Sequence, residues 1–78
     1  MTIETQIEAM IESLVPDLKG LVKEIEGGHK TTQNHYGRYM SLIAKIGGDS
    51  KPMRNIVALA LLRAGANRAG VSSALSLS

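Results

Sequence analysis

Hydrophobic residues in the first third of the chain recur at alternating intervals of four and three, which places them on one face of a helix. This stripe predicts a helix over residues 3–26. Pro16 falls on the opposite face and should kink the helix rather than end it, because the stripe continues past it in phase. Part of the stripe must pack on the rest of the chain, and a seam with a second copy is an additional hypothesis. The stripe consists of Ile7, Ile11, Leu14, Leu18, Leu21 and Ile25.

Three further segments have helical periodicity, and each is bounded by capping side chains or glycines. Apolar residues reach almost all the way round the second of these segments, so we expect it to be the most buried helix. The sequence therefore predicts an all-α bundle of three main helices plus a short C-terminal helix, in a single domain covering residues 1–78. The three segments are residues 32–46, 51–64 and 67–77.

The composition limits how this domain can be stabilised. A chain of 78 residues without Cys, Phe or Trp has a small core and no disulfide. Such a chain is marginal alone, so we expect a homo-oligomer. The lack of Cys fits a reducing cytoplasm. We expect no membrane association, because the longest apolar run, residues 56–62, is too short to cross a bilayer and no signal peptide is evident.

Charge is distributed unevenly along the chain. Residues 1–26 hold six acids and two bases, a balance of −4, whereas residues 27–78 hold one acid and seven bases, a balance of +6. Either an anionic partner binds the second part, or the two parts pair with each other inside the molecule.

The stretch from Gly27 to Tyr39 contains both histidines, both tyrosines and the densest cluster of hydrogen-bonding side chains. The start of a helix normally attracts acids, yet no acid occurs from Gly27 to Gly48. Glycines, a lysine, hydroxyls and free N–H groups at a helix start can form an anion-binding cradle. The alternative is a loop that leads into a capped surface helix. The candidate ligand-binding residues are His29, Lys30, Thr31, Thr32, Asn34, Tyr36, Arg38 and Tyr39.

In the predicted second helix we expect an inner stripe of Tyr36, Met40 and Ile43, with Tyr39 and Ile46 at its edge. The opposite face of this helix is polar. Asn34, Arg38, Ser41 and Lys45 recur on it at intervals of four, three and four, beside Gly37. Amide, guanidinium and ammonium groups with a tyrosine nearby are suited to nucleic acid. The alternative is an ordinary solvated face.

Other constellations are incomplete. His29 and His35 do not share a helix face and have no acid near them in sequence, so we expect no metal site and no cofactor. No nucleophile–base pair is evident, which favours a nonenzymatic role. Residues 66–72 resemble the middle of a helix-turn-helix, but the segment after them has no side chain that could read bases.

The segment Ala64-Gly65-Ala66-Asn67-x-x-Gly70-Val71-x-x-Ala74-Leu75 resembles the closing hairpin of small bacteriophage-encoded helical proteins. The resemblance covers about a dozen residues, from Ala64 to Leu75. It implies an accessory protein that binds a host factor or a host signalling molecule, and it carries over no individual functional residue.

Two functions are compatible with these patterns. The first is a nonenzymatic, oligomeric protein that binds a phosphate-bearing ligand, either a nucleotide or nucleic acid, through residues 29–39. The second is a phage-type protein-interaction module that inhibits or sequesters a host protein. Phosphate contacts are weakened steeply by salt, whereas apolar docking is much less sensitive, so salt dependence discriminates between them.

Overall fold

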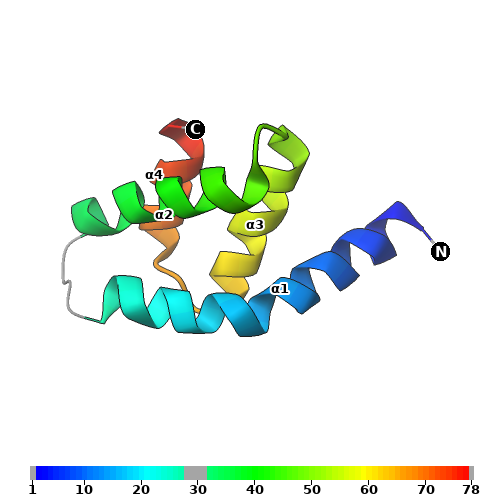
Figure 1. Ribbon diagram of the computed structural model, residues 1–78, viewed down its shortest axis with the longest axis horizontal. Helices are drawn as coiled ribbons and strands as arrows, with labels where there is room; N and C mark the ends of the chain where they lie inside the picture. The colour runs from blue at the N-terminus through cyan, green and yellow to red at the C-terminus, as the bar shows by residue number, and fades with distance from the viewer. Residues whose placement is uncertain (1, 28–31, 78) are drawn as a thin grey trace.

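The computed structural model describes residues 2–27 and 32–77, without the side chains of residues 32–34 and 77 (Figure 1). These residues form four helices and no strand, which confirms the all-α prediction. Each helix begins and ends within one residue of its predicted limits. The helices are α1 (Ile3–Glu26), α2 (Thr32–Gly47), α3 (Lys51–Arg63) and α4 (Arg68–Leu77).

Side-chain caps and glycines set several of these limits. The Thr5 N–H donates to Thr2 Oγ1 at 3.2 Å, so the earlier of the two possible threonine caps starts α1. Ser50 caps α3 and Asn67 caps α4 in the same way. The left-handed turns after α2 and α3 fall on Gly48 and Gly65, where a side chain would be strained. Thr31 and Thr32, whose hydroxyls are suited to cap the start of α2, lie outside the residues whose side chains are described.

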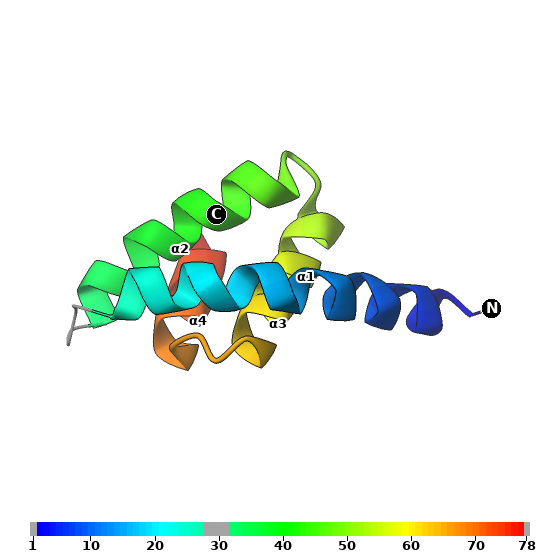
Figure 2. The same cartoon turned by 60° about the horizontal axis from the view of Figure 1, so that its bottom comes forward.

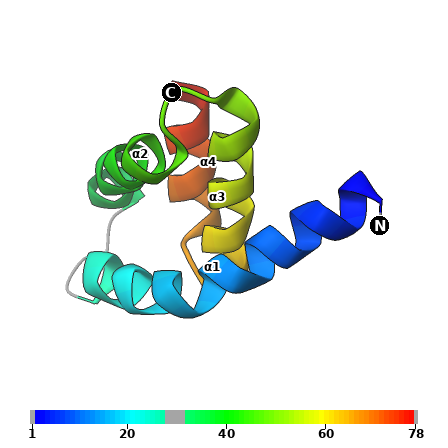
Figure 3. The ribbon, with the colours of Figure 1, turned by 45° about the vertical axis from the view of Figure 1, so that its right-hand side comes forward.

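Helix α1 is continuous through Pro16 but bent near its middle (Figures 1 and 3). A proline ring removes one backbone hydrogen bond and displaces the preceding turn, which bends a helix without breaking it when the flanking turns are well packed. The C-terminal part of α1 lies along the other helices, and its N-terminal part extends away from them (Figure 3).

The α3–α4 hairpin fills the space between α1 and α2 (Figures 1 and 2). Helix α3 contacts each of the other three helices, and the most extensive contact in the molecule joins α2 to α4. Helices α1 and α2 contact each other only slightly. They are consequently held at a distance by the hairpin, and a groove is left between them.

The apolar stripe of α1 packs on the protein's own core. Ile11, Leu18 and Ile25 are buried, and the alternate members of the stripe are half-buried and pack against the same cluster. The intramolecular role of the stripe is therefore established by contacts within one chain. The half-buried members are Ile7, Leu14 and Leu21.

The buried face of α2 is rotated from the one predicted. The sequence pattern placed Tyr36 on the inner stripe and Tyr39 at its edge, whereas Tyr39 and Ile43 have no exposed surface and Tyr36 is half-buried. His35 is also buried, so the inner face is centred on an i, i+4 row that begins at a histidine. Periodicity alone did not identify this row, because a polar residue occupies its first position.

Gly70 explains the close contact between α2 and α4. A Cβ atom on Gly70 would lie 3.1 Å from the Cβ of His35 and 3.3 Å from the Tyr39 ring. This glycine therefore faces α2, the helix with which α4 makes its most extensive contact. Gly70 also lies inside a continuous α4, so no turn occurs there and the helix-turn-helix resemblance does not hold.

Helix α3 carries the centre of the core, but it is not buried all round. Val57, Ala60 and Leu61 have no exposed surface, whereas Leu59 is 48% exposed. The expectation that Leu59 extends the buried face is therefore wrong, because α4 covers only part of that side of α3.

We predict that Leu61→Ala lowers the free energy of unfolding by about 2–5 kcal/mol, because it leaves a cavity in a fully packed site. Leu59→Ala is the matched control and should cost much less, since the Leu59 side chain is half in water. Chemical unfolding followed by circular dichroism measures both. Equal losses for the two variants would contradict the assignment of Leu61 to the core.

Candidate functional site

The structure places three of the eight predicted ligand-binding residues. His29, Lys30 and Thr31 lie outside the described residues, and the side chains of Thr32 and Asn34 are not described. The remaining three are Tyr36, Arg38 and Tyr39, and they lie on three different sides of α2. These three described residues therefore do not share one surface of α2.

Tyr39 belongs to the core. Its ring has no exposed surface, and its hydroxyl donates a hydrogen bond to the Glu26 carboxylate at the end of α1. A ring without exposed surface cannot stack on a base, so we leave Tyr39 out of the binding surface. Burial, together with the neighbouring Glu26 carboxylate, raises the pKa of the Tyr39 hydroxyl well above its ordinary value.

The same Glu26 oxygen also accepts a hydrogen bond from the backbone N–H of Asn67. Asn67 in turn caps α4, because its Oδ1 accepts from the Gly70 N–H at 2.9 Å. One carboxylate thus joins the end of α1, the middle of α2 and the start of α4. A negative charge at the start of α4 is favourable, since the helix dipole is positive there.

Tyr36 lies on the side of α2 that faces α4. With Ser72, Ser73 and Ser76 it lines a shallow hollow of about 410 Å³. Its ring is half-buried, and the described residues that line the hollow with it include no cation. Tyr36 is therefore separated from Arg38 by the body of α2.

Arg38 lines the groove between α1 and α2, which we call the α1–α2 groove. This open groove has a volume of about 400 Å³. Its apolar residues come from both helices, and its polar residues come mainly from the α2 face that the sequence marked as a possible nucleic-acid surface. The lining is Leu21, Glu24, Ile25, Gly37, Arg38, Ser41, Leu42 and Lys45.

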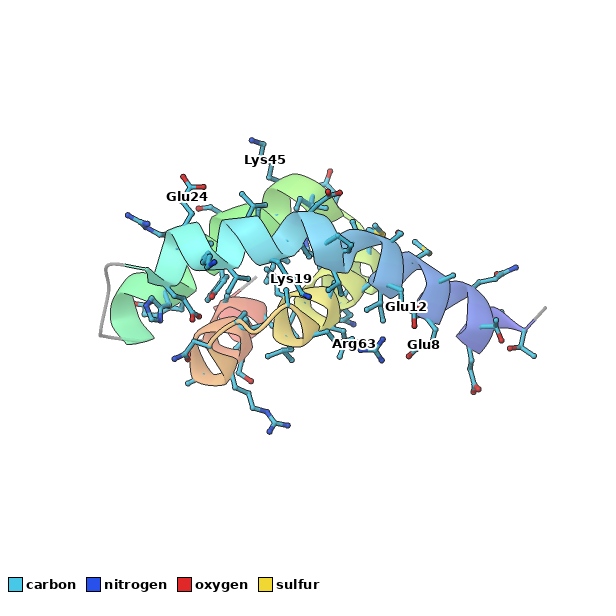
Figure 4. All side chains as sticks on the ribbon, turned by 90° about the horizontal axis from the view of Figure 1, so that it is seen from below. Glu8, Glu12, Lys19, Glu24, Lys45 and Arg63 are labelled. Atoms are coloured by element: carbon cyan, nitrogen blue, oxygen red, sulfur yellow. The ribbon has the colours of Figure 1, made fainter. Side chains whose placement is uncertain are left out.

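Two cations and one acid border the α1–α2 groove. Arg38 and Lys45 are exposed and two helical turns apart, or about 10 Å along α2. Figure 4 shows Glu24 and Lys45 projecting on one side of α1, with Lys19 and Arg63 on the other side. The groove therefore offers two positive groups from α2 opposite one carboxylate from α1.

Gly37 and Ser41 form the α2 wall between these cations. A Cβ atom on Gly37 would meet nothing within 4 Å, so the backbone there is open to a ligand. Ser41 Oγ donates to the Gly37 carbonyl oxygen at 3.1 Å, which leaves the Ser41 hydroxyl oxygen as an acceptor. Charged donors in the groove must consequently come from Arg38 and Lys45.

A second hollow, about 600 Å³ in volume, lies on the other side of α1 beside the α3–α4 turn. Lys19 and Lys23 border it, and Glu26 is the acid that lines it. This hollow lies at the junction of the helices, where the Glu26 carboxylate is already bonded to Tyr39 and Asn67. It provides a natural comparison for the α1–α2 groove, since it also has two cations and one acid.

Part of the charge asymmetry is resolved by an ion pair between the two halves of the chain. The Arg63 guanidinium donates to both Glu8 carboxylate oxygens, at 2.7 and 2.8 Å. This hydrogen bonding lowers the pKa of Glu8, and Glu12 adds a further negative charge near Arg63. Arg38 and Lys45 lie on the opposite side of α1 from this pair.

Sequence analysis identified the α2 wall of the groove but missed its α1 wall. Leu21 and Ile25 were assigned to a helix seam, and Glu24 was counted only as charge. Glu24 is on the solvent side of the α1 stripe, and no pattern within one helix shows which neighbour it will face. The described part of the chain contains no cluster of three or more metal-ligating side chains.

Comparison of the chain with protein-family models, curated proteins and solved structures gave no match. Among the described residues, no helix has the length and apolar character needed to span a membrane. The functional argument therefore depends on the chemistry of the α1–α2 groove itself.

We predict that the free energy of unfolding falls as the pH rises above about 10, because Tyr39 loses its proton more readily in the unfolded chain than in the core. Below that pH this contribution is fully present. Chemical unfolding at a series of pH values measures it, with Tyr39→Phe as the test variant and Tyr36→Phe as the control. The same steepness of the alkaline decline in Tyr39→Phe and wild type would contradict the prediction.

Proposed function

We propose that this protein is a nonenzymatic binder of a phosphate-bearing ligand, held in the α1–α2 groove. The observation that carries the proposal is the placement of Arg38 and Lys45 on one groove, beside an open backbone at Gly37. A guanidinium binds phosphate through paired hydrogen bonds, and an ammonium binds it as a point charge. Both side chains are exposed, so each can reach a ligand without a change of fold.

The distance between the two cations limits which phosphate-bearing ligands fit the groove. Two helical turns separate Arg38 from Lys45, so each cation can contact a different phosphate of a longer ligand. A short single strand or a dinucleotide carries phosphates at separate positions and can occupy both ends. Such a ligand should therefore bind more tightly than a mononucleotide.

None of the described residues that line the groove is aromatic, which limits base recognition. Tyr39 is in the core, and Tyr36 lies on the far side of α2. Base stacking, the usual source of affinity for single strands, is therefore replaced by contact with the apolar side chains of Leu21, Ile25 and Leu42. We expect little dependence on base identity. The Glu24 carboxylate can accept hydrogen bonds from sugar hydroxyls or base amino groups.

We predict that Arg38→Gln and Lys45→Gln each weaken binding of a short single strand by about 1–3 kcal/mol, through loss of a charge-assisted hydrogen bond. Glu24→Gln should tighten binding, because it removes a negative charge that faces the phosphates. Fluorescence anisotropy with a labelled oligonucleotide measures all three. The logarithm of the affinity should fall with the logarithm of the salt concentration at a slope of about −1.4 for two contacts, and at about −0.7 in Arg38→Gln.

Lys19→Gln and Lys23→Gln are the matched controls, since they remove one cation each from the hollow on the other side of α1. Neither should change the affinity by as much as Arg38→Gln. A larger effect from these controls would move the ligand to that hollow. Failure of single strands, dinucleotides and mononucleotides to bind wild type at low salt would reject the proposal in favour of a protein-interaction module.

A further inference from the structure

The first eight residues of α1, Ile3 to Met10, project beyond the other helices, and we call them the arm (Figures 1 and 2). No arm residue is buried, and Ile11 is the first residue of α1 in the core. Ile3 is 74% exposed and Met10 is 40% exposed. Ile7 packs against the edge of the core and Glu8 is paired with Arg63, whereas the Ile3 and Met10 side chains remain largely in water. A docking surface that covered Ile3 and Met10 would therefore stabilise the arm.

The arm has an apolar stripe and a consistent charge. Ile3, Ile7 and Met10 are spaced by four and three residues, which places them on one face. The charged residues of the arm are Glu4 and Glu8, of which Glu8 is already paired with Arg63, and the arm contains no base. Two arms packed against each other would bring like charges together, so another arm is a poor acceptor.

A groove between α3 and α4, which we call the α3–α4 groove, has the complementary character. It has a volume of about 330 Å³, and two of its leucines, Leu59 and Leu75, are 48% and 37% exposed. None of the described residues that line it is acidic. The lining is Asn55, Ala58, Leu59, Leu62, Val71, Ser72 and Leu75.

One end of the α3–α4 groove is cationic. A neighbouring hollow shares Asn55 and Leu75 with it and is also lined by Lys51 and Arg54. Lys51 is exposed, and Arg54 Nε donates to the Gly48 carbonyl oxygen at 2.9 Å. An acidic helix with an apolar stripe therefore meets an apolar floor and a positive end.

The two surfaces also match in length. Asn55, Leu59 and Leu62 are spaced by four and three residues along α3, the same spacing as the apolar stripe of the arm. Each row spans two helical turns, or about 10 Å, as packing of helix ridges into grooves requires. The arm cannot fill its own groove, because it continues without a break into the part of α1 that packs on the core.

We propose that the arm of one copy docks in the α3–α4 groove of a second copy. This head-to-tail contact is independent of ligand binding in the α1–α2 groove, which uses other residues. The residues of α1 that contact the second copy are then Ile3, Ile7 and Met10. Leu18 is not among them, because it is buried in the core of its own chain.

Light scattering and native mass spectrometry over a range of concentrations test the proposal with three proteins. Wild type should have a mass above that of one chain, 8.3 kDa. Met10→Glu in the arm and Leu59→Glu in the groove should each be monomeric, because each lacks one of the two surfaces. A mixture of the two variants should form a complex of two chains and no larger species, since one intact arm and one intact groove remain.

Separate control variants test whether added charge or a loss of folding, and not loss of the docking contact, explains the result. Ala9→Glu adds the same charge to an exposed position of the arm away from its apolar stripe, and Ala44→Glu does so on the exposed side of α2. Both should associate as wild type does. Leu59→Gln, which adds no charge, should weaken association with unchanged helical circular dichroism.

The outcomes separate the possibilities cleanly. A wild type that is monomeric throughout would overturn the proposal. So would Leu59→Glu and Leu59→Gln that associate like wild type, or a mixture of the two folded variants that remains monomeric. Loss of association in Met10→Glu alone would indicate contact between two arms instead.

Discussion

The carboxylate of Glu26 fixes how the helices of this protein meet. It ends α1, accepts hydrogen bonds from the Tyr39 hydroxyl and the Asn67 N–H, and so joins α1 to α2 and to the start of α4. Its charge is unfavourable at the C-terminus of its own helix and favourable at the N-terminus of α4. The chain has no disulfide and no Phe or Trp, so a polar junction of this kind has an unusually large share in specifying one arrangement.

Gly70 makes this junction possible by letting α4 approach α2 closely enough for Tyr39 to be enclosed. Once the Tyr39 ring is enclosed, its hydroxyl needs a partner within the protein, and Glu26 is that partner. The junction and the close helix packing therefore depend on each other. Helices α1 and α2 are consequently held apart, since the α3–α4 hairpin then occupies the space between them.

Local sequence patterns predicted the helices well because caps, glycines and apolar periodicity act over a few residues. They did not predict which side of α2 is buried, because His35 interrupts the apolar row, nor that Leu59 is exposed. The contacts of Glu26 span 13 and 41 residues, and no local spacing encodes them. The candidate site shows the same division: Arg38 and Lys45 were visible as one helix face, whereas the opposing Glu24 depends on how two helices are placed.

The bend of α1 has a geometric consequence for an assembly of identical subunits. In a head-to-tail contact, the rotation that relates one subunit to the next depends on the angle between the arm and the body and on how the arm lies in the groove. Pro16 lies between the two parts of α1, so the bend there contributes to that rotation. A rotation that divides a full turn evenly, with no shift along its axis, closes a ring, and other arrangements produce an open helical filament. The bend at the proline would thus influence the symmetry of the assembly, although it lies outside both contact surfaces.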